Sequence, residues 1–594
     1  MHRMLARAVC LSFAASGAIA QPRTDLNIRS APVWFEETGG IALVSPNGRW
    51  AVFQGIAPTL YDLVTKREVV VPLPRVENIS VIGFRPSGDV FVRGTVDGQP
   101  GLYAGASRGV AKLNLPSDAL PLWSRDGKQV AFLRRSMPDS GIFLGPVDHS
   151  RAIRIAGGVR GFAWSPTEDA LFVSAIDKAG RSTLYKISGD GTRSSAIARD
   201  LDAPPGPHGI AVAPDGRHIF IPLASDAAPN DLERSEPHAS RWSSIYSIDA
   251  TDGSRRLAVK GDGADLIGPS VTGGRLYWTR TESRQSIIVL PFQGNAALAT
   301  IPGAAVPSWR PDGRQLGFFY GDMRIADWAI NWDAGVMDIG SSGRPAGPLT
   351  PLVHNYGEDF EPEWSPNGRW IAYHSHRSAK PIAGYEQQES DDIWLRRPGR
   401  PVRDTADIRL TDFGFEAGPP SWSHDGTRIA FVSFDRKGRP GISLLWLVTL
   451  DTASGHSTHA AKVPLPASMS SVSWVAWSPV GDELAIEANG SKEGEHTLWR
   501  MRPDGTRALK LLEFTQHTYG GVAWTPDGKT LLYSALVADG PFDQLFSIPA
   551  MGGQPRQLTR ESGHVLHPAV SPNGKWIAAT KIERKVTLVS IPVP

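Results

Sequence analysis

Histidine, tyrosine and carboxylate side chains gather in two neighbouring stretches of this 594-residue chain. The first reads His354-Asn355-Tyr356-Gly357-Glu358-Asp359, and the second begins His374-Ser375-His376-Arg377. Residues two positions apart on a strand point to the same side, so His374 and His376 are spaced to suit two imidazole ligands of a metal ion, with a nearby carboxylate as the third. The same side chains also suit proton transfer or the binding of a polar ligand.

Further candidates occur in two later stretches, which contain His517 and Tyr519 and then Glu561, His564 and His567. The alternative is that these are solvated loop residues and histidines satisfied at strand edges, because 15 histidines make some clustering expected. We predict a ligand-binding surface, with no metal ion and no cofactor. If His374 and His376 serve a ligand, their replacement should spare stability. The candidate residues are His354, Tyr356, Glu358, Asp359, His374, His376, Arg377, His517, Tyr519, His564 and His567.

Motifs of catalytic and cofactor sites are missing. The sequence has no His-Glu-x-x-His, no Walker loop and no Cys-x-x-Cys. Gly105-Ala106-Ser107-Arg108-Gly109 matches Gly-x-Ser-x-Gly, but a nucleophile elbow needs a strand before the serine and a helix after it. Here β runs flank the motif on both sides. We interpret it as a hairpin turn and assign no catalytic residue.

An internal repeat determines which elements carry the candidates. An aromatic or apolar residue is followed by Ser-Pro-Asp-Gly or a variant, and then by an apolar run. Successive copies lie about 40–58 residues apart, which is the period of a four-stranded propeller blade. The twelve copies are Val44–Phe53, Phe84–Val92, Trp123–Phe132, Trp164–Val173, Val212–Ile221, Val271–Trp278, Trp309–Phe318, Trp364–Tyr373, Trp422–Phe431, Trp477–Ile486, Trp524–Tyr533 and Val570–Ala579.

The repeats predict an all-β fold of two tandem β-propellers built from four-stranded blades. A single ring usually has about four to eight blades, so six plus six is the simplest division, with five plus seven as the alternative. We place the first propeller at residues 21–303 and the second at residues 304–594. Val586–Ile591 is predicted as the third strand of the final blade, and Asn27–Phe35 as the strand that clasps the ring by pairing the chain ends.

Blade topology places the candidates on one face. The first-to-second and third-to-fourth turns share one face of a propeller, while the second-to-third loops and the connections between blades share the other. All candidate residues fall on the second face. On the first face, we predict that the turn residues cap the turns rather than bind cations, and that the tryptophans pack between blades rather than stack on sugars. The turn residues are Asp126, Asp215, Asp312, Asn367, Asp425, Asp527 and Asn573, and the tryptophans are Trp123, Trp164, Trp309, Trp364, Trp422, Trp477 and Trp524.

Residues 1–20 have the pattern of a secretory signal peptide. Arg3 and Arg7 precede a short apolar run, and Ala18-Ile19-Ala20 is a cleavage site that predicts a mature chain from Gln21. The mature chain would be formally neutral and would lack the single cysteine, Cys10, which excludes disulfides and a cysteine nucleophile. Balanced charge does not favour nucleic acid as a partner. We expect a periplasmic or secreted monomer without a membrane span.

The repeats resemble those of the TolB-type β-propeller family. The best copies are Trp364–Tyr373, Trp422–Phe431 and Trp524–Tyr533, and blades often end in Leu-Thr, as at Leu410-Thr411. TolB itself has a smaller α/β domain before its propeller. Here the first repeat starts about 24 residues after the predicted cleavage site, which leaves no room for that domain. Related repeats precede the catalytic domain of prolyl-oligopeptidase-like and amidohydrolase-like enzymes, whereas here repeats run to the C-terminus.

Two functions follow from these features. The first is an exported binding or scaffold module for a protein, peptide or glycan of the cell envelope. The second is a propeller-based polysaccharide lyase or hydrolase, with His, Tyr, Arg and carboxylate side chains on the loop face of the C-terminal propeller.

Overall fold

The computed structural model describes residues 26–27 and 42–593, apart from gaps in the connections. The gaps of three or more residues are 54–58, 71–75, 135–140, 147–152, 177–181, 202–208, 225–242, 262–264, 322–332, 354–358, 376–380, 403–405, 413–417, 435–442, 490–494, 517–519 and 538–541. The described residues form strands, turns and bends without a helix, which confirms the all-β class. No helix in this part of the chain is long and apolar enough to cross a membrane.

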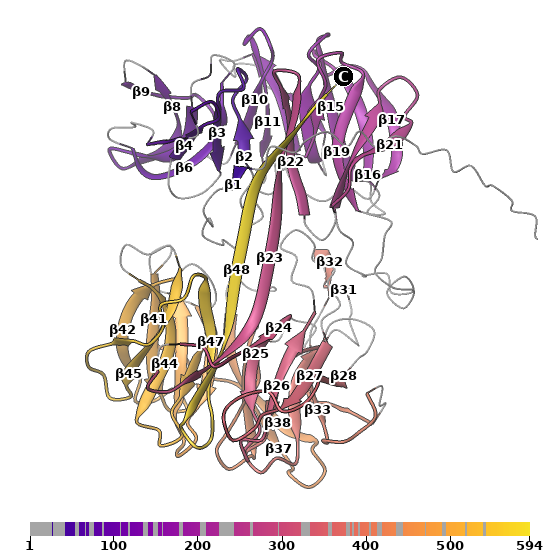
Figure 1. Cartoon of the computed structure of the whole chain (residues 1–594). Coiled ribbons are helices and arrows are strands. Elements are labelled where there is room, and N and C mark those ends of the chain that lie inside the picture. The colour runs from indigo at the N-terminus through magenta and orange to yellow at the C-terminus, as the bar shows by residue number, and fades with distance from the viewer. Residues whose placement is uncertain are drawn as a thin grey trace, which may run out of the picture.

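Five four-stranded antiparallel sheets follow one another in the N-terminal half, and we call the body that they form the first ring (Figure 1). The second strands are buried over consecutive residues, as at Val130–Leu133 and Ala170–Ala175, because neighbouring blades cover both faces of each sheet. The strands are β2 (Ala42–Val44), β3 (Trp50–Phe53), β4 (Thr59–Asp62), β5 (Arg67–Val70), β6 (Glu77–Phe84), β7 (Val90–Val96), β8 (Gln99–Ala106), β9 (Gly109–Lys112), β10 (Leu120–Trp123), β11 (Gln129–Arg134), β12 (Gly141–Pro146), β13 (Ile153–Ala156), β14 (Val159–Trp164), β15 (Ala170–Ile176), β16 (Ser182–Ser188), β17 (Ser194–Leu201), β18 (Ala211–Val212), β19 (His218–Ala224), β20 (Ser243–Asp249) and β21 (Arg255–Val259).

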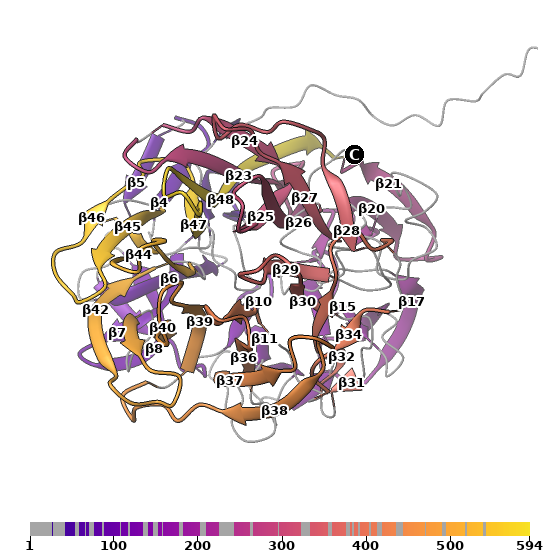
Figure 2. The same cartoon turned by 90° about the horizontal axis from the view of Figure 1, so that it is seen from below.

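Five further four-stranded sheets form the second ring, whose blades surround a common axis with their first strands innermost (Figure 2). The hairpin β31–β32 projects from one of its blades toward the first ring (Figure 1). The strands are β25 (Ala304–Trp309), β26 (Gln315–Tyr320), β27 (Asp333–Asp338), β28 (Thr350–Val353), β29 (Asp359–Trp364), β30 (Ile371–Ser375), β31 (Pro381–Ile382), β32 (Tyr385–Glu389), β33 (Asp392–Arg396), β34 (Ile408–Arg409), β35 (Ser421–Trp422), β36 (Arg428–Phe434), β37 (Ser443–Leu450), β38 (Ser457–Lys462), β39 (Ser471–Trp477), β40 (Leu484–Asn489), β41 (Glu495–Met501), β42 (Leu509–Thr515), β43 (Val522–Trp524), β44 (Thr530–Leu536), β45 (Asp543–Pro549) and β46 (Arg556–Gln557).

Two long strands belong to both rings. β23 (Arg275–Pro291) pairs along its whole length with β48 (Trp576–Pro592), and together they run from one ring to the other (Figure 1). In the first ring, the sheet order is β22 (Asp265–Thr272), the first half of β23, the second half of β48 and β1 (Leu26–Asn27). In the second ring, the order is β47 (His564–Val570), the first half of β48, the second half of β23 and β24 (Ala299–Pro302).

In each ring, the sheet shared by β23 and β48 therefore takes its third strand from the other half of the chain. A regular blade joins its second and third strands by a loop, but here the second strand continues straight into the other ring. In both rings, the end of the blade at which the second strand leaves must therefore face the other ring. The two rings consequently turn the same face toward each other, and the described candidates Asp359, His374 and His564 lie at strand ends on this side of the second ring.

The predicted clasp between the chain ends is confirmed, but its place is different. Leu26 pairs with Leu588 and Asn27 with Thr587, while residues 28–35 of the predicted strand lie outside the described residues. The prediction that Val586–Ile591 completes the final blade is wrong, because these residues pair with the first half of β23 in the first ring. The division into six plus six blades and the boundary at residue 303 stay predictions.

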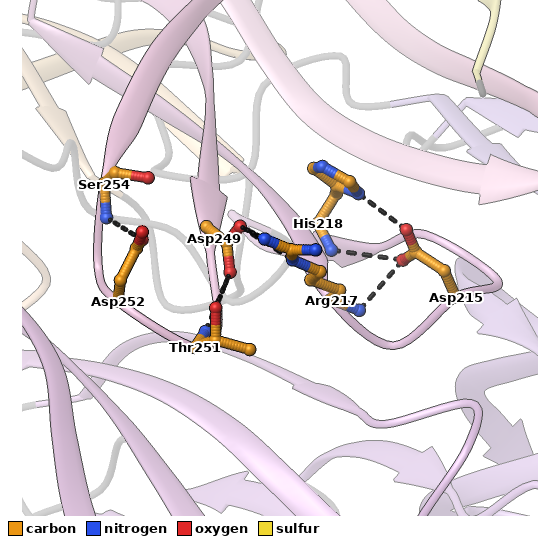
Figure 3. Close-up of polar contacts among 7 residues, drawn as sticks. All are labelled: Asp215, Arg217, His218, Asp249, Thr251, Asp252 and Ser254. Carbon is orange, nitrogen blue, oxygen red and sulfur yellow. Dashed lines mark hydrogen bonds and ion pairs between the residues drawn. The ribbon is translucent and has the colours of Figure 1, made fainter.

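The turns on the outer faces have the predicted capping chemistry. At all seven turn positions named above, the side-chain oxygen of the Asp or Asn accepts a hydrogen bond from the backbone N–H two residues later, over 2.8–3.1 Å. Figure 3 shows one example, in which Asp215 accepts from Arg217 N at 2.8 Å and contacts His218 Nδ1 at 2.6 Å. The bond from Lys128 N holds the pKa of Asp126 below its usual range, and bonds from Thr525 Oγ1 and Lys529 N do the same for Asp527. The oxygens are therefore used within the turns.

The repeated tryptophans join neighbouring blades, as predicted. The indole N–H of Trp164 donates to Leu122 O of the preceding blade at 3.0 Å, and that of Trp524 donates to Ala476 O at 3.0 Å. Trp309 Nε1 donates to Ala569 O at 3.2 Å, which links the first and last blades of the second ring. In Trp164, Trp309, Trp422 and Trp524, the indole N–H is used in a bond to the neighbouring blade, which supports a packing role for these residues.

Replacing Gly426 with valine is expected to destabilise the protein by about 1–3 kcal/mol, because its φ of 70° is a conformation that a β-branched residue resists. Gly481 occupies the same repeat position in the next blade, but it is not among the residues with positive φ and has open space around its Cα. Gly481→Val is therefore the matched control. Thermal unfolding should show a lower Tm for Gly426→Val than for Gly481→Val; equal values would refute the turn assignment.

Candidate functional site

Four of the eleven predicted binding residues are described, namely Asp359, His374, His564 and His567. The other seven lie outside the described residues, so their roles stay predictions. They are His354, Tyr356, Glu358, His376, Arg377, His517 and Tyr519.

His374 is a packed side chain near the end of β30. It is 7% exposed, its Nε2 lies 3.0 Å from Glu361 Oε2, and its ring stacks on Phe360 with centroids 4.8 Å apart. This burial favours the alternative that His374 is satisfied within its blade, because truncation would leave Glu361 without this partner. His376 lies beyond the end of β30, so the proposed two-imidazole arrangement is not described.

Asp359 and His564 are fully buried. His564 Nδ1 lies 3.0 Å from Asp543 Oδ2 and 3.2 Å from Asp543 N, which ties the start of β47 to the start of β45 in the neighbouring blade. Both side chains of this pair have no exposed surface. The geometry suits a structural link between blades rather than a group that meets a ligand.

His567 is the predicted residue that reaches the inner surface of the ring. It is half-buried, its φ is 49°, and its ring stacks on Trp474 with centroids 5.0 Å apart. Gly521 of the intervening blade leaves room for this stack, since a Cβ there would lie 3.2 Å from both Trp474 Cε2 and His567 Cα. Two half-buried rings of different blades thus form one aromatic platform.

A buried polar cluster, which the sequence analysis missed, lies beside this platform. We call Glu487, Gln516, His496 and Ser473 the Glu487 cluster. Gln516 Nε2 donates to Glu487 Oε1 at 2.5 Å and lies 3.2 Å from His496 Nδ1, while Ser473 Oγ donates to Glu487 Oε1 at 3.3 Å. Glu487 is 1% exposed and Gln516 is 3% exposed. Glu487 also pairs in register with Trp474, so the cluster backs the platform.

The environment shifts the protonation of two of these groups. Desolvation raises the pKa of Glu487 to about 7, although the hydrogen bonds from Gln516 and Ser473 oppose the shift. Desolvation also lowers the pKa of His496, which favours its neutral ring. Glu487 Oε2 has no hydrogen-bond partner among the described residues. The cluster therefore contains a carboxyl group that titrates near neutral pH, beside an imidazole whose uncharged form is favoured.

Comparison of the repeats gives the signal that would have found Glu487. It follows Leu484-Ala485-Ile486, whereas Val432 follows Ile429-Ala430-Phe431 at the same position of the preceding blade. One blade earlier, the same position holds His374. In the last two blades, it holds Ser534 and Thr580. Thr580 Oγ1 lies 3.3 Å from His567 Nδ1, so this layer of second-strand side chains meets the innermost strand. Among the described residues, no group of three or more His, Cys, Asp or Glu side chains could hold a metal ion.

The comparisons with known proteins agree with the repeat analysis. Residues 417–592 match the family model of the TolB beta propeller domain, which confirms the resemblance for this part of the chain. The chain is 26% identical over 225 residues to an uncharacterized peptidase, YuxL, of Bacillus subtilis, which is 36% of this chain and 28% of that protein. It is also 26% identical over 239 residues to dipeptidyl-peptidase 5 of Porphyromonas gingivalis, which is 40% of this chain and 32% of that protein. The matches thus span about a third of these relatives.

Solved structures of propeller proteins resemble the chain at low identity. The tricorn protease is 12% identical with a TM-score of 0.31, and the match covers 87% of this chain and 57% of the protease. TolB from Acinetobacter baumannii is 14% identical with a TM-score of 0.25, and the match covers 74% of this chain and 82% of TolB. Neither likeness bears on function.

Proposed function

We propose that the protein is an exported binding module, and that its second ring holds a protein, peptide or glycan segment on the platform of Trp474 and His567. The observation that carries this proposal is the stack of two half-buried rings over a position without a side chain. Aromatic faces of this kind contribute large contact area with little loss of side-chain entropy. β39 and β47, which carry the two rings of the platform, begin on the side that the first ring opposes, so a segment that reached the platform from that side would pass between the two propeller rings.

Export of the protein is part of the same proposal. The leader at residues 1–20 supports cleavage before Gln21 and a periplasmic or secreted location, with an envelope protein or glycan as partner. A monomer suffices for this function, because one chain supplies both facing rings.

The binding test uses the full mature chain on a glycan array and a peptide library, followed by calorimetry with the best hit. The double variant Trp474→Ala/His567→Ala should weaken binding at least tenfold. Trp446→Ala is the matched control, since Trp446 is a half-buried tryptophan in β37 that contacts Lys462 instead. Unchanged affinity of a folded double variant would refute the site.

A second candidate is a role linked to peptide hydrolysis, which the identity to two peptidases favours. The lyase or hydrolase alternative gains less support, because His374 and His564 are buried and already paired with carboxylates. Release of unsaturated, ultraviolet-absorbing product from a uronate polymer would nevertheless establish it.

A further inference from the structure

One oxygen of the Glu487 cluster is left without a donor in a site that excludes water. Glu487 Oε1 accepts from Gln516 and Ser473, whereas Glu487 Oε2 has less than 1 Å² of exposed surface and no hydrogen-bond partner among the described residues. An ionised carboxylate in this position would keep a charged oxygen both desolvated and unpaired, which is far more costly than a neutral acid.

The titratable groups around Glu487 do not offset a negative charge on its carboxylate. On β41, His496 is driven toward its neutral form by burial, and its Nδ1 lies 3.2 Å from Gln516 Nε2. On β45, the negative charge of Asp543 acts on Glu487 unfavourably, although Asp543 is itself paired with His564 of β47. On β39, Ser473 and Trp474 carry no charge. Besides these groups, the backbone N–H of Gly520 favours the anion.

We propose that Glu487 is a proton-binding site that couples pH to the aromatic platform. The folded ring holds the proton on Glu487 Oε2, and the proton leaves to solvent when the carboxyl ionises. The new charge then favours movement of the carboxylate or of its neighbours toward water. Its neighbours are joined directly to the platform, because Trp474 lies opposite Glu487 in the sheet register and Gly520 O accepts from His567 N at 2.5 Å.

The direction of the effect on stability follows from the proton balance. The folded chain binds the proton more tightly than the unfolded chain, in which the glutamate has its ordinary pKa of about 4.5. The contribution of Glu487 to stability is therefore fully present at low pH and is lost as the pH rises to about 7, where the folded group titrates. This inference concerns the protein without ligand and does not depend on the proposed binding function.

The test is a titration of tryptophan emission in the mature chain between about pH 5 and 9, a range that lies above the ordinary pKa of glutamate and contains the raised pKa of Glu487. Wild type should show a transition with a midpoint near neutrality, and Glu487→Gln should lose most of its amplitude while keeping the emission of the low-pH form. Trp474→Phe should remove the same transition, because the reporter is lost. Glu363→Gln is the matched control, since desolvation raises the pKa of this second glutamate of the ring to about 7 as well.

Two results would overturn the proposal. One is a transition of full amplitude and unchanged midpoint in folded Glu487→Gln. The other result comes from infrared spectroscopy of Glu363→Gln, in which Glu487 is intact. This measurement is used if Glu487→Gln does not fold. The carbonyl band of a protonated carboxyl should then be present at low pH and fade toward about pH 8, and its absence throughout would show that Glu487 is ionised in the folded ring.

Discussion

Deletion of residues 586–594 is expected to unfold the first ring, although these residues lie about 300 positions after its other strands in sequence. The deletion removes the second half of β48, which is the third strand of a sheet in that ring. Leu588 and Val589 would be lost from its core, and Leu276 and Trp278 of β23 would be uncovered; all four are at most 3% exposed. Burial of one such side chain contributes about 1.5–3 kcal/mol, so the sum is comparable to the roughly 5–15 kcal/mol that stabilises a typical domain.

A pair of single variants tests the same point without shortening the chain. Leu588→Asp places a charge in the shared sheet, whereas Leu509→Asp places it on β42, where the leucine is 41% exposed. Calorimetry should show early loss of the first ring for Leu588→Asp and a nearly unchanged profile for Leu509→Asp. A first ring that melts normally after the deletion would show that it does not need β48.

Arg396→Ala is expected to destabilise the second ring by about 3–5 kcal/mol, because it breaks a buried ion pair. The Arg396 side chain has no exposed surface, and its Nε lies 3.8 Å from Asp407 Oδ1. Its terminal nitrogens donate to Leu352 O and Pro401 O, so the residue joins two blades. Truncation would leave a buried carboxylate and two carbonyls without these donors, and Tm should fall by roughly 6–20 °C.

The adjacent residue supplies the control for this prediction. Arg397 is exposed, with its guanidinium 4.2 Å from the centroid of the Trp370 ring, and an exposed cation–π contact is worth only about 0.5–1 kcal/mol. Arg397→Ala should therefore have a small effect. Replacing Arg396 and Asp407 together by apolar residues should recover part of the loss; equal melting of the Arg396→Ala and Arg397→Ala variants would contradict the argument.

The features that the sequence predicted well are those that each repeat specifies locally. A Pro-Asp-Gly turn and the tryptophan before it act within one blade or on the next, so one copy contains the information for its own geometry. Asp425 illustrates this, because its oxygen accepts from Thr427 N at 3.0 Å within the same turn. The platform instead depends on Trp474 and His567 from two blades and on Gly521 between them, so no single repeat reveals that these residues meet.

The exchange of strands was missed for a different reason, although its signal is present. Residues 276–290 and 576–590 contain no Gly, Pro, Asn or Asp, so neither has the turn-forming residues that end a strand. The corresponding connection after β36 reads Asp435-Arg436-Lys437-Gly438 and has them. The pattern of four strands per repeat suggested a loop at both places, and that expectation concealed two uninterrupted strands.

The shared sheet also gives the chain an unusual order of events during synthesis. The partner that covers the first half of β23 is β48, so this edge stays open until roughly 300 more residues have been made. At about 5–20 residues per second, the delay is roughly 15–60 s. The ring that is translated first is thus completed last, and a nascent chain exposes an unpaired edge for nearly the whole second half of its translation. Chaperones that shield such edges would have their greatest effect on this protein before the ribosome releases it.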